Sequence, residues 1–253
     1  MSSAELHSLF RKILMRVAVD TPPSTPPTLE PLELPTLCDG RHPAGIVHED
    51  FSALHGSGGY LARMAHFEAA SVAAFMHLAA ELDDLGAPLN LIEQAKQAAR
   101  DEVVHAHSVA ALAKARGARP PVPRLTPPPL RTLEEVAAEN AAEGCVREAF
   151  GALVGLYQSV HAKADDVRAT MRTVAQDEIA HAALSFELHR HFLSRLDGEA
   201  RARVEARREQ ALAELLHRAF SFEDAPWRDE LGLPAADALF DLARAFREEL
   251  AAA

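Results

Sequence analysis

Apolar residues recur at intervals of three and four along most of the chain, a spacing that predicts amphipathic helices. A short helix is expected over residues 4–19, where Leu6, Phe10 and Ile13 fall at helical intervals. Its few basic residues favour packing on the rest of the protein or on a partner over binding at a membrane surface. Four longer helices are expected over residues 60–85, 90–115, 132–161 and 164–195, and two more over residues 199–220 and 235–250.

Proline and glycine separate these helices. Thirteen of the 16 prolines fall in residues 22–43 and 120–129, and proline removes helix donors and favours extended backbone. The first of these connectors is expected to be a linker or a strap over the helices, and the second a long crossover between two helix pairs. Short joins within each pair, such as the one at Gly86, make its helices antiparallel neighbours. Asn90 is expected to cap the second helix of the first pair.

Residues 44–59 join the first connector to the long helices and end in Gly-Ser-Gly-Gly. We expect a covering loop there. Its charged and histidine residues have no regular ligand spacing, so that a solvated loop is favoured over a second metal site. These residues are His48, Glu49, Asp50 and His55.

The length of 253 residues allows one large domain or two small ones. One domain with appendages fits the pattern better. We expect an N-terminal extension over residues 1–57, a helical bundle over residues 58–196 and a C-terminal helical extension over residues 197–253. The two C-terminal helices have no ligand spacing and suit packing or a homodimer interface.

Composition narrows the class of protein. The formal net charge of −11 argues against a nucleic-acid partner, which requires concentrated lysine and arginine. Cys38 and Cys145 are the only cysteines, too few for the disulfide framework of a small secreted domain. No apolar run approaches the length of a transmembrane helix, and the first residues do not resemble a signal peptide. A cytoplasmic protein without membrane contact is expected.

Two stretches of the same chemistry stand 76 residues apart: Asp101-Glu102-Val103-Val104-His105 and Asp177-Glu178-Ile179-Ala180-His181. In a helix, a Glu and a His three positions later are about 60° and one turn apart, so that both side chains reach a single ion. One Glu-x-x-His alone is more often a solvated face or a core pair. The second copy favours a metal site made from both.

A partner carboxylate precedes each copy at a matched distance. Glu68 lies 34 residues before Glu102, and Glu143 lies 35 residues before Glu178. A phenylalanine follows seven residues after each partner carboxylate, in both halves. We interpret this agreement as an internal duplication of a helix pair.

This constellation resembles the ferritin-like di-iron carboxylate superfamily, in which two helices each give a Glu and two others each give Glu-x-x-His. The resemblance covers residues 58–196 and implies an all-α fold, a ferritin-like four-helix bundle with an N-terminal extension and two additional C-terminal helices. It implies two iron ions, although the same ligands suit manganese. By resemblance, Glu102 and Glu178 bridge the ions, Glu68 and His105 complete one ligand set, and Glu143 and His181 complete the other.

The acids before the ligand glutamates have an implied role as well. Metal-bound histidine usually donates its second N–H to a carboxylate or a carbonyl. In relatives, the acid of one motif orients the histidine of the other. Asp101 is therefore assigned to His181, and Asp177 to His105.

Three acids on the third long helix compete for the ligand position. Glu143 is preferred, because Glu139 has no counterpart in the first pair and Glu148 would lie about 140° around a regular helix. Both alternatives are expected in salt bridges. Arg147, one turn beyond Glu143, would point into the interhelical space, where a cation needs an anionic partner. It either pairs with an acid such as Glu148 or acts as a catalytic residue that receives a substrate carboxylate or phosphate.

Nearby apolar residues complete the expected surroundings. Phe75 and Phe150 would be the walls of a pocket or plain core. Cys145, about 160° around the helix from Glu143, should face away and pack.

Two functions share this ligand set. The first is a di-iron oxidoreductase that activates dioxygen to oxidise or oxygenate a small organic substrate. The second is a ferroxidase or another iron-handling protein, and a metal-free structural bundle would have no use for the ligands. The N-terminal strap and the added C-terminal helices favour the enzyme. Because the chain has no rubredoxin-like cysteine pair, a separate electron donor is expected.

Overall fold

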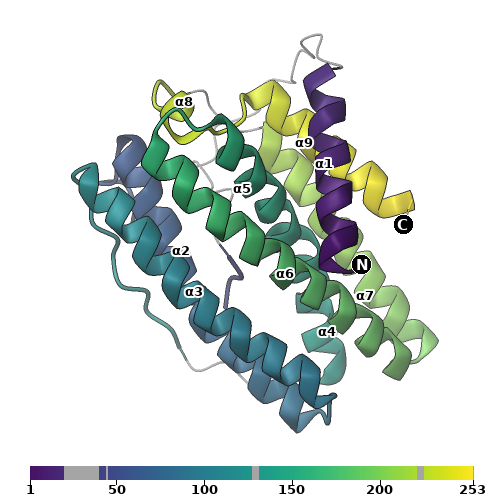
Figure 1. Ribbon diagram of the computed structural model, residues 1–253. Coiled ribbons are helices and arrows are strands. Elements are labelled where there is room, and N and C mark those ends of the chain that lie inside the picture. Colours follow the sequence, from purple (N-terminus) through teal and green to yellow (C-terminus); the bar gives the residue numbers. More distant parts are fainter. Residues whose placement is uncertain (20–39, 44, 127–130, 221–224, 253) are drawn as a thin grey trace.

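The computed structural model describes residues 1–19, 40–43, 45–126, 131–220 and 225–252. These residues are mostly helical, and within them no β-strand forms, although Ile46 and Leu125 make an isolated antiparallel bridge. The expected all-α class is confirmed (Figure 1). The elements are α1 Ser3–Val19, α2 Gly56–Asp84, α3 Leu89–Ala115, α4 Leu133–Ala142, the π-helix η1 Glu143–Glu148, α5 Ala149–His161, α6 Asp165–Arg195, α7 Gly198–Phe220, α8 Arg228–Leu231 and α9 Ala236–Ala252.

Two helix pairs form the centre of the molecule. The four-residue join 85–88 turns α2 back along α3, and Gly86 takes the positive φ of +65° that the turn requires. Residues 162–164 join α5 to α6 in the same way, and α3 also packs on α6. The crossover over residues 116–132 connects the pairs. Asn90 lies inside α3 and caps nothing, because the helix begins one residue earlier, after Pro88.

The third long helix is divided into three parts. It begins at a capping box in which the Thr132 side chain accepts from the Glu135 backbone N–H and the Glu135 carboxylate accepts from the Thr132 backbone N–H. After Ala142 the backbone widens into η1, with hydrogen bonds from residue i+5 to residue i, and returns to an α-helix at Ala149. The prediction of one regular helix over residues 132–161 is therefore wrong.

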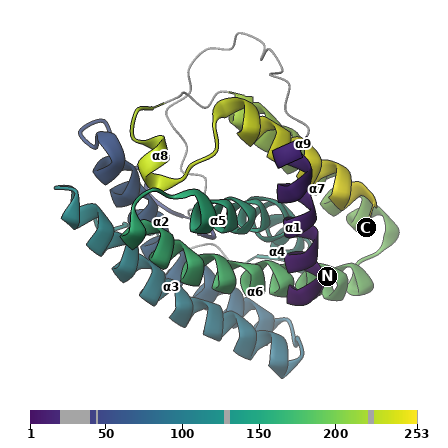
Figure 2. The ribbon, with the colours of Figure 1, turned by 45° about the horizontal axis from the view of Figure 1, so that its top comes forward.

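The terminal helices pack on this centre. Leu6, Phe10 and Ile13 are buried where α1 meets α6 and α9, and the rings of Phe10 and Phe246 lie 6.3 Å apart. The expected packing of the first helix on the protein itself is confirmed. Helix α7 packs on α4, η1 and α9. Figures 1 and 2 show α1, α7 and α9 together on one side, opposite α2 and α3.

The connectors are described in part. Residues 22–39, with Cys38, and residues 127–130 lie outside the described residues. The covering loop pairs with the crossover, since the Val47 N–H donates to the Arg124 carbonyl and the Thr126 N–H donates to the Gly45 carbonyl, each at 2.9 Å. Glu49 forms an ion pair with Arg124 at 2.7 Å. None of the helices in the described part is long and apolar enough to cross a membrane.

The apolar core has two parts with polar residues between them. One part gathers side chains such as Tyr60, Val109 and Phe150, and the other gathers Phe75, Leu78 and Leu188. The candidate site lies between these two regions, at the middle of α2, α3 and α6 and at η1.

Candidate metal centre

Six side chains with metal-binding groups meet between the helices. Each is at most 5% exposed. Buried acids are rare unless they are paired or bind a metal. The six are Glu68 of α2, Glu102 and His105 of α3, Glu148 at the end of η1, and Glu178 and His181 of α6.

These side chains form two overlapping groups. Ligand atoms of Glu68, Glu102, His105 and Glu178 lie within 4.8 Å of one another, and so do ligand atoms of Glu102, Glu148, Glu178 and His181. The two shared members are Glu102 and Glu178. This overlap can form two adjacent ion positions that share two carboxylates.

The separations suit ions better than hydrogen bonds. His105 Nδ1 lies 3.4 Å from Glu178 Oε1, 3.5 Å from Glu102 Oε2 and 3.7 Å from Glu68 Oε2. His181 Nδ1 lies 3.6 Å from an oxygen of Glu102 and of Glu178. Most of these exceed hydrogen-bond length. Two ligands that each bind one ion at about 2.1 Å, with angles between 90° and 120°, are about 3.0 to 3.6 Å apart, a range that includes all of these distances except the one to Glu68.

The atoms that face the centre have no hydrogen-bond partner. Such buried groups cost about 1 to 3 kcal/mol each when nothing satisfies them. Because they converge on the same two positions, divalent ions would satisfy them together. The unpartnered atoms are Glu68 Oε2, both carboxylate oxygens of Glu102, His105 Nδ1, Glu148 Oε1, Glu178 Oε1 and His181 Nδ1.

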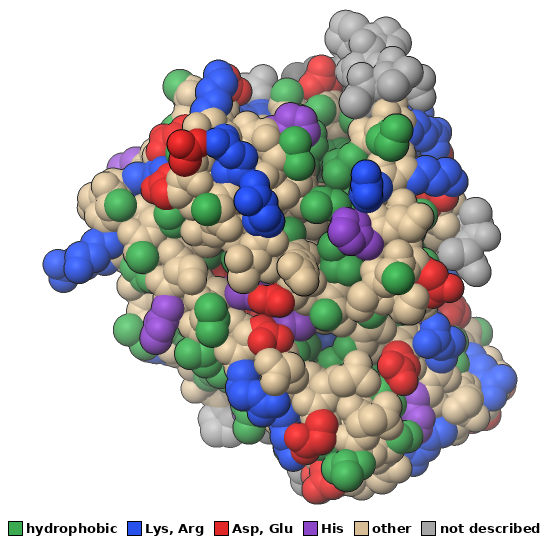
Figure 3. All heavy atoms as spheres, in the orientation of Figure 1, with side chains coloured by type: hydrophobic (Ala, Val, Ile, Leu, Met, Phe, Trp, Pro, Cys, Tyr) green, Lys and Arg blue, Asp and Glu red, His purple; other side chains and the backbone are tan. Residues whose placement is uncertain are grey.

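The acids before the ligand glutamates lie where the crossed arrangement places them. His105 Nε2 is 3.1 Å from Asp177 Oδ2, and His181 Nε2 is 3.3 Å from Asp101 Oδ2. A histidine that donates its Nε2–H to a carboxylate keeps the Nδ1 lone pair free for an ion. The side chains of Asp101 and Asp177 are 25% and 37% exposed. Figure 3 shows acidic and histidine side chains next to one another near the middle of the face formed by α3 and α6.

The electrostatics of the cluster call for positive charge. Burial raises the pKa of Glu102, and neighbouring carboxylates raise it further. Burial lowers the pKa of a histidine, yet the carboxylates around His105 and His181 raise the pKa of both above the usual range. Burial also acts to raise the pKa of Glu178, but the two histidines outweigh it and lower that pKa to about 2. Four carboxylates in a low dielectric are stable only beside cations or protons.

Glu148 occupies the place in which Glu143 was expected. The carboxylate of Glu143 points instead to Arg147, with which it forms an ion pair. The expectation fails because it assumed regular α-helical rotation, whereas the π-helix turns less per residue and brings Glu148 inward. Both Glu139 and Glu148 form the expected salt bridges, each with Arg41, at 2.8 Å and 3.8 Å.

Arg147 does not reach the cluster either. Its Nη2 lies 2.7 Å from Glu214 Oε2 on α7, and Nη1 pairs with Glu143. Arg147 therefore pairs with acids, which is the first of its two expected roles, although neither acid is Glu148. The catalytic role of Arg147 has no support from this geometry. Phe150 is core beside Phe246, with ring centroids 5.6 Å apart.

Two other expectations for the surroundings can be compared with the structure. The Phe75 ring lies edge-on to the His181 ring at 5.1 Å and so does line the cluster. Cys145 is buried as expected and donates to the Ser185 carbonyl at 3.4 Å. Burial raises the pKa of its thiol to about 12, so that the thiol is neutral and packs.

Arg41 is a buried residue beside the cluster that the sequence did not indicate. It is 1% exposed, and its Nη1 lies 3.8 Å from Glu148 Oε2. It follows the first proline-rich connector, where no periodicity reports which side chains enter the core. No signal in the single sequence could have identified it.

A pocket of about 550 Å³ opens beside the centre. It reaches Asp177, the acid that holds His105. Arg172 gives it a cationic edge, and Leu156 and Ile179 give it apolar walls. The lining comprises Ser3, Ala4, His7, Leu156, Ser159, Arg172, Gln176, Asp177, Ile179 and Ala180.

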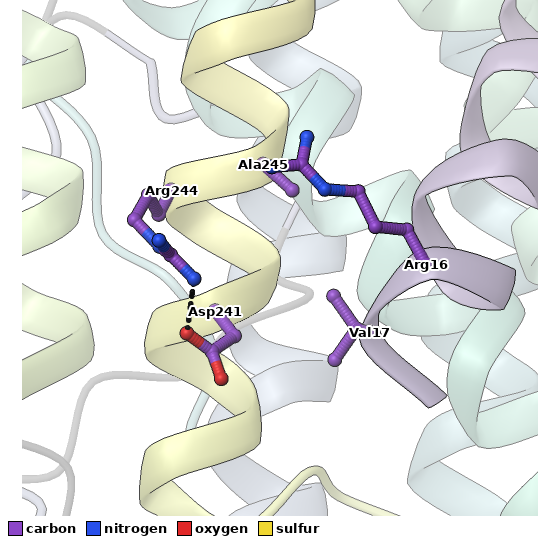
Figure 4. A pocket seen from close by; sticks show the side chains of 5 residues that line it. All are labelled: Arg16, Val17, Asp241, Arg244 and Ala245. Atoms are coloured by element: carbon purple, nitrogen blue, oxygen red, sulfur yellow. Dashed lines mark hydrogen bonds and ion pairs between the residues drawn. The ribbon is translucent and has the colours of Figure 1, made fainter. Parts of the chain in front are cut away.

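A smaller pocket, of about 160 Å³, lies between α1 and α9, far along the chain from the ligand residues (Figure 4). Its two guanidinium groups are already paired. Arg244 binds Asp241 at 2.9 Å, and Arg16 binds Glu248 at 2.8 Å. These pairs make the smaller pocket a poor anion site.

Comparisons of the chain with protein-family models, with curated proteins and with solved structures find no match. The chemistry of the centre therefore rests on its own residues.

Proposed function

We propose that this chain is a di-metal oxidoreductase of the ferritin-like kind, which holds two iron ions and reacts with dioxygen. The observation that carries the proposal is the pair of ligand groups that share Glu102 and Glu178 and direct unpartnered atoms to two adjacent positions. Carboxylate oxygen with some imidazole suits iron, and manganese is the alternative ion. When bound, the metal pair supplies one-electron redox chemistry with dioxygen, which no side chain of the chain supplies.

The protein residues divide the remaining work. Glu68 and His105 would hold one ion, Glu148 and His181 the other, and the shared glutamates both. Asp101 and Asp177 orient the histidines through their Nε2–H groups. The burial of the ligands keeps bulk water away and favours ions that stay in place.

The pocket at Asp177 favours an organic substrate over iron storage. Its volume falls in the range of small-molecule sites. Arg172 forms no ion pair within the described part of the chain, so that it can bind a carboxylate or phosphate group while Leu156 and Ile179 contact an apolar part. The proposed substrate is a small organic anion, and electrons beyond those it gives must come from a separate donor. The partly exposed acids Asp101 and Asp177 would equally suit iron entry, which keeps a ferroxidase as the second candidate.

Iron loading distinguishes the two candidates. The metal-free protein is loaded anaerobically with excess ferrous iron, exposed to dioxygen, and analysed for bound iron and oxygen consumption with and without small organic acids. The proposal predicts about two retained ions per chain, no mineral, and oxygen consumption that an organic acid increases. Uptake of hundreds of ions per assembly as a soluble ferric core would show an iron-handling protein. Oxidation no faster than that of free ferrous iron would contradict both candidates.

A further inference from the structure

Arg41 lies beside one ligand group and not the other. Its Nη1 is 3.8 Å from Glu148 Oε2, and its Cζ lies 5.8 Å from the centroid of the Phe75 ring, which contacts His181. Glu148 and His181 belong to the second ligand group. Glu68, the corresponding acid of the first group, has no lysine or arginine partner among the residues that the structure describes.

The guanidinium is held in place from several sides. Arg41 Nε and Nη2 donate to the two carboxylate oxygens of Glu139 at 3.1 and 2.8 Å, and Nη1 and Nη2 share Asn140 Oδ1 at 3.3 Å. The Ser71 hydroxyl donates to the Arg41 carbonyl at 2.9 Å. A bidentate arginine pair has a fixed geometry. The charge therefore stays at this side of the centre.

Two glycines leave room for this arrangement. Gly40 has a φ of +59°, and a Cβ there would clash with Ser71 Oγ and lie 3.2 Å from Glu102 Oε1, the oxygen nearest His181 Nδ1. A Cβ on Gly144 would lie 3.1 Å from Arg41 Nη1. The absence of a side chain at these two positions thus leaves space for Arg41 beside the second ligand group.

The Arg41 guanidinium also has a defined orientation between Glu139 and Glu148. Glu139 binds the Nε and Nη2 side of the guanidinium, while Nη1 points toward Glu148. The partner acid consequently lies on the far side of the arginine from the ligand. In a buried site, where the effective dielectric is low, a nearby positive charge repels a divalent ion strongly.

We propose that Arg41 makes the two metal positions unequal, because its charge beside Glu148 weakens divalent-ion binding at the His181 position relative to the His105 position. This inference rests on the two-metal centre proposed above. Two bound ions repel each other, so that the second ion binds more weakly than the first at whichever position it occupies. A difference between the first and second binding steps therefore does not by itself show the role of Arg41. The test must measure each position separately.

Two variants isolate the positions. His181→Ala leaves the His105 position complete, and His105→Ala leaves the His181 position complete. Each metal-free variant is titrated anaerobically with Mn²⁺, and the free ion is measured by electron paramagnetic resonance. We expect one ion per chain in both, with weaker binding in His105→Ala by on the order of tenfold.

The effect of the Arg41 charge is then tested in both the His105→Ala and the His181→Ala variants. Arg41→Gln should tighten Mn²⁺ binding in His105→Ala by on the order of tenfold and change it far less in His181→Ala. Arg41→Lys keeps the charge and should leave the weak binding of His105→Ala in place. Glu139→Gln, which removes the acid behind Arg41 at a part-exposed site, should weaken that binding further and tests the same charge where Arg41→Gln does not fold.

The outcomes separate this inference from the proposed function. If the wild-type chain does not bind two Mn²⁺ ions, the two-metal centre itself is wrong. If it binds two, but the isolated positions have equal affinity or Arg41→Gln changes both backgrounds alike, the centre stands and Arg41 only supports the fold. An unchanged affinity in Glu139→Gln, on the His105→Ala background, would also overturn the role of the charge.

Discussion

At the scale of single residues, Glu143 and Glu148 are five positions apart and have opposite surroundings. Glu148 has an unpartnered oxygen at the cluster, whereas Glu143 is paired with Arg147. We predict that Glu148→Ala lowers the bound metal from two ions per chain to one. Glu143→Ala should keep two ions and cost about 1 to 3 kcal/mol of stability, since a buried ion pair is lost although Arg147 keeps Glu214 as a partner. Metal analysis after anaerobic loading counts the ions in both variants, and denaturant unfolding measures the stability of Glu143→Ala. If Glu143→Ala loses an ion and Glu148→Ala keeps two, Glu143 is the ligand.

The crossed acids give a second prediction at this scale. Asp177→Asn and Asp101→Asn should each weaken metal binding by about 10- to 100-fold, because an amide no longer fixes the tautomer of the ligand histidine. The loss should appear at the His105 position for Asp177→Asn and at the His181 position for Asp101→Asn. The exposed Asp84 serves as the control for loss of a surface charge. If Asp177→Asn, Asp101→Asn and Asp84→Asn all bind metal as tightly as the wild-type chain, the histidines need no orienting acid.

The residues found by sequence were those that a regular repeat describes. Glu102, His105, Glu178 and His181 share a three-residue spacing on regular helices, and that spacing is kept in α3 and α6. Glu148 was missed because the matched seven-residue distance to a phenylalanine made Glu143 the natural counterpart of Glu68. Arg41 was missed because its place depends on tertiary packing of a connector.

At the scale of elements, η1 determines which acid faces the centre. Gly144 lies within it, and a Cβ there would lie 2.6 Å from Ser185 Cβ on α6. Ser185 in turn donates to Glu148 Oε2 at 3.2 Å. We predict that Gly144→Ala destabilises the protein by about 1 to 3 kcal/mol and weakens metal binding at the His181 position. Denaturant unfolding and Mn²⁺ titration measure the two effects.

The matched control is Gly198→Ala, at the start of α7, where an added Cβ meets nothing within 4 Å. Its stability should change by less than about 0.5 kcal/mol. Equal stability of the two variants would show that the close contact between η1 and α6 is not needed.

Helix positions could be predicted because apolar periodicity and breakers such as Gly86 are local signals, and α2, α3 and α6 begin and end within a few residues of the expected limits. The division of the third long helix into α4, η1 and α5 could not be predicted from such local signals. A π-helix is rare and occurs mostly as a short insertion in an α-helix. The one here packs on α6, α7 and Arg41, and the sequence around Glu143 does not report these contacts.

At the scale of the whole molecule, the terminal helices close the side of the bundle away from α2 and α3. Phe10 is fully buried between α6 and α9, whereas Met15 on the same helix is 70% exposed. We predict that Phe10→Ala lowers the free energy of unfolding by about 3 to 5 kcal/mol, while Met15→Ala changes it by less than about 0.5 kcal/mol. If the two substitutions have similar small effects, α1 is not part of the folded core.

The two ligand groups lie between two apolar core regions, which ties the fold to the proposed chemistry. The most direct test of the central claim is the anomalous scattering of crystals loaded anaerobically with ferrous iron, recorded at the iron absorption edge. We predict two peaks per chain, about 3.5 to 4 Å apart, one bound by Glu68 and His105 and the other by Glu148 and His181, with Glu102 and Glu178 between them. A single peak, a peak bound by Glu143, or no peak within the cluster would contradict the two-metal centre.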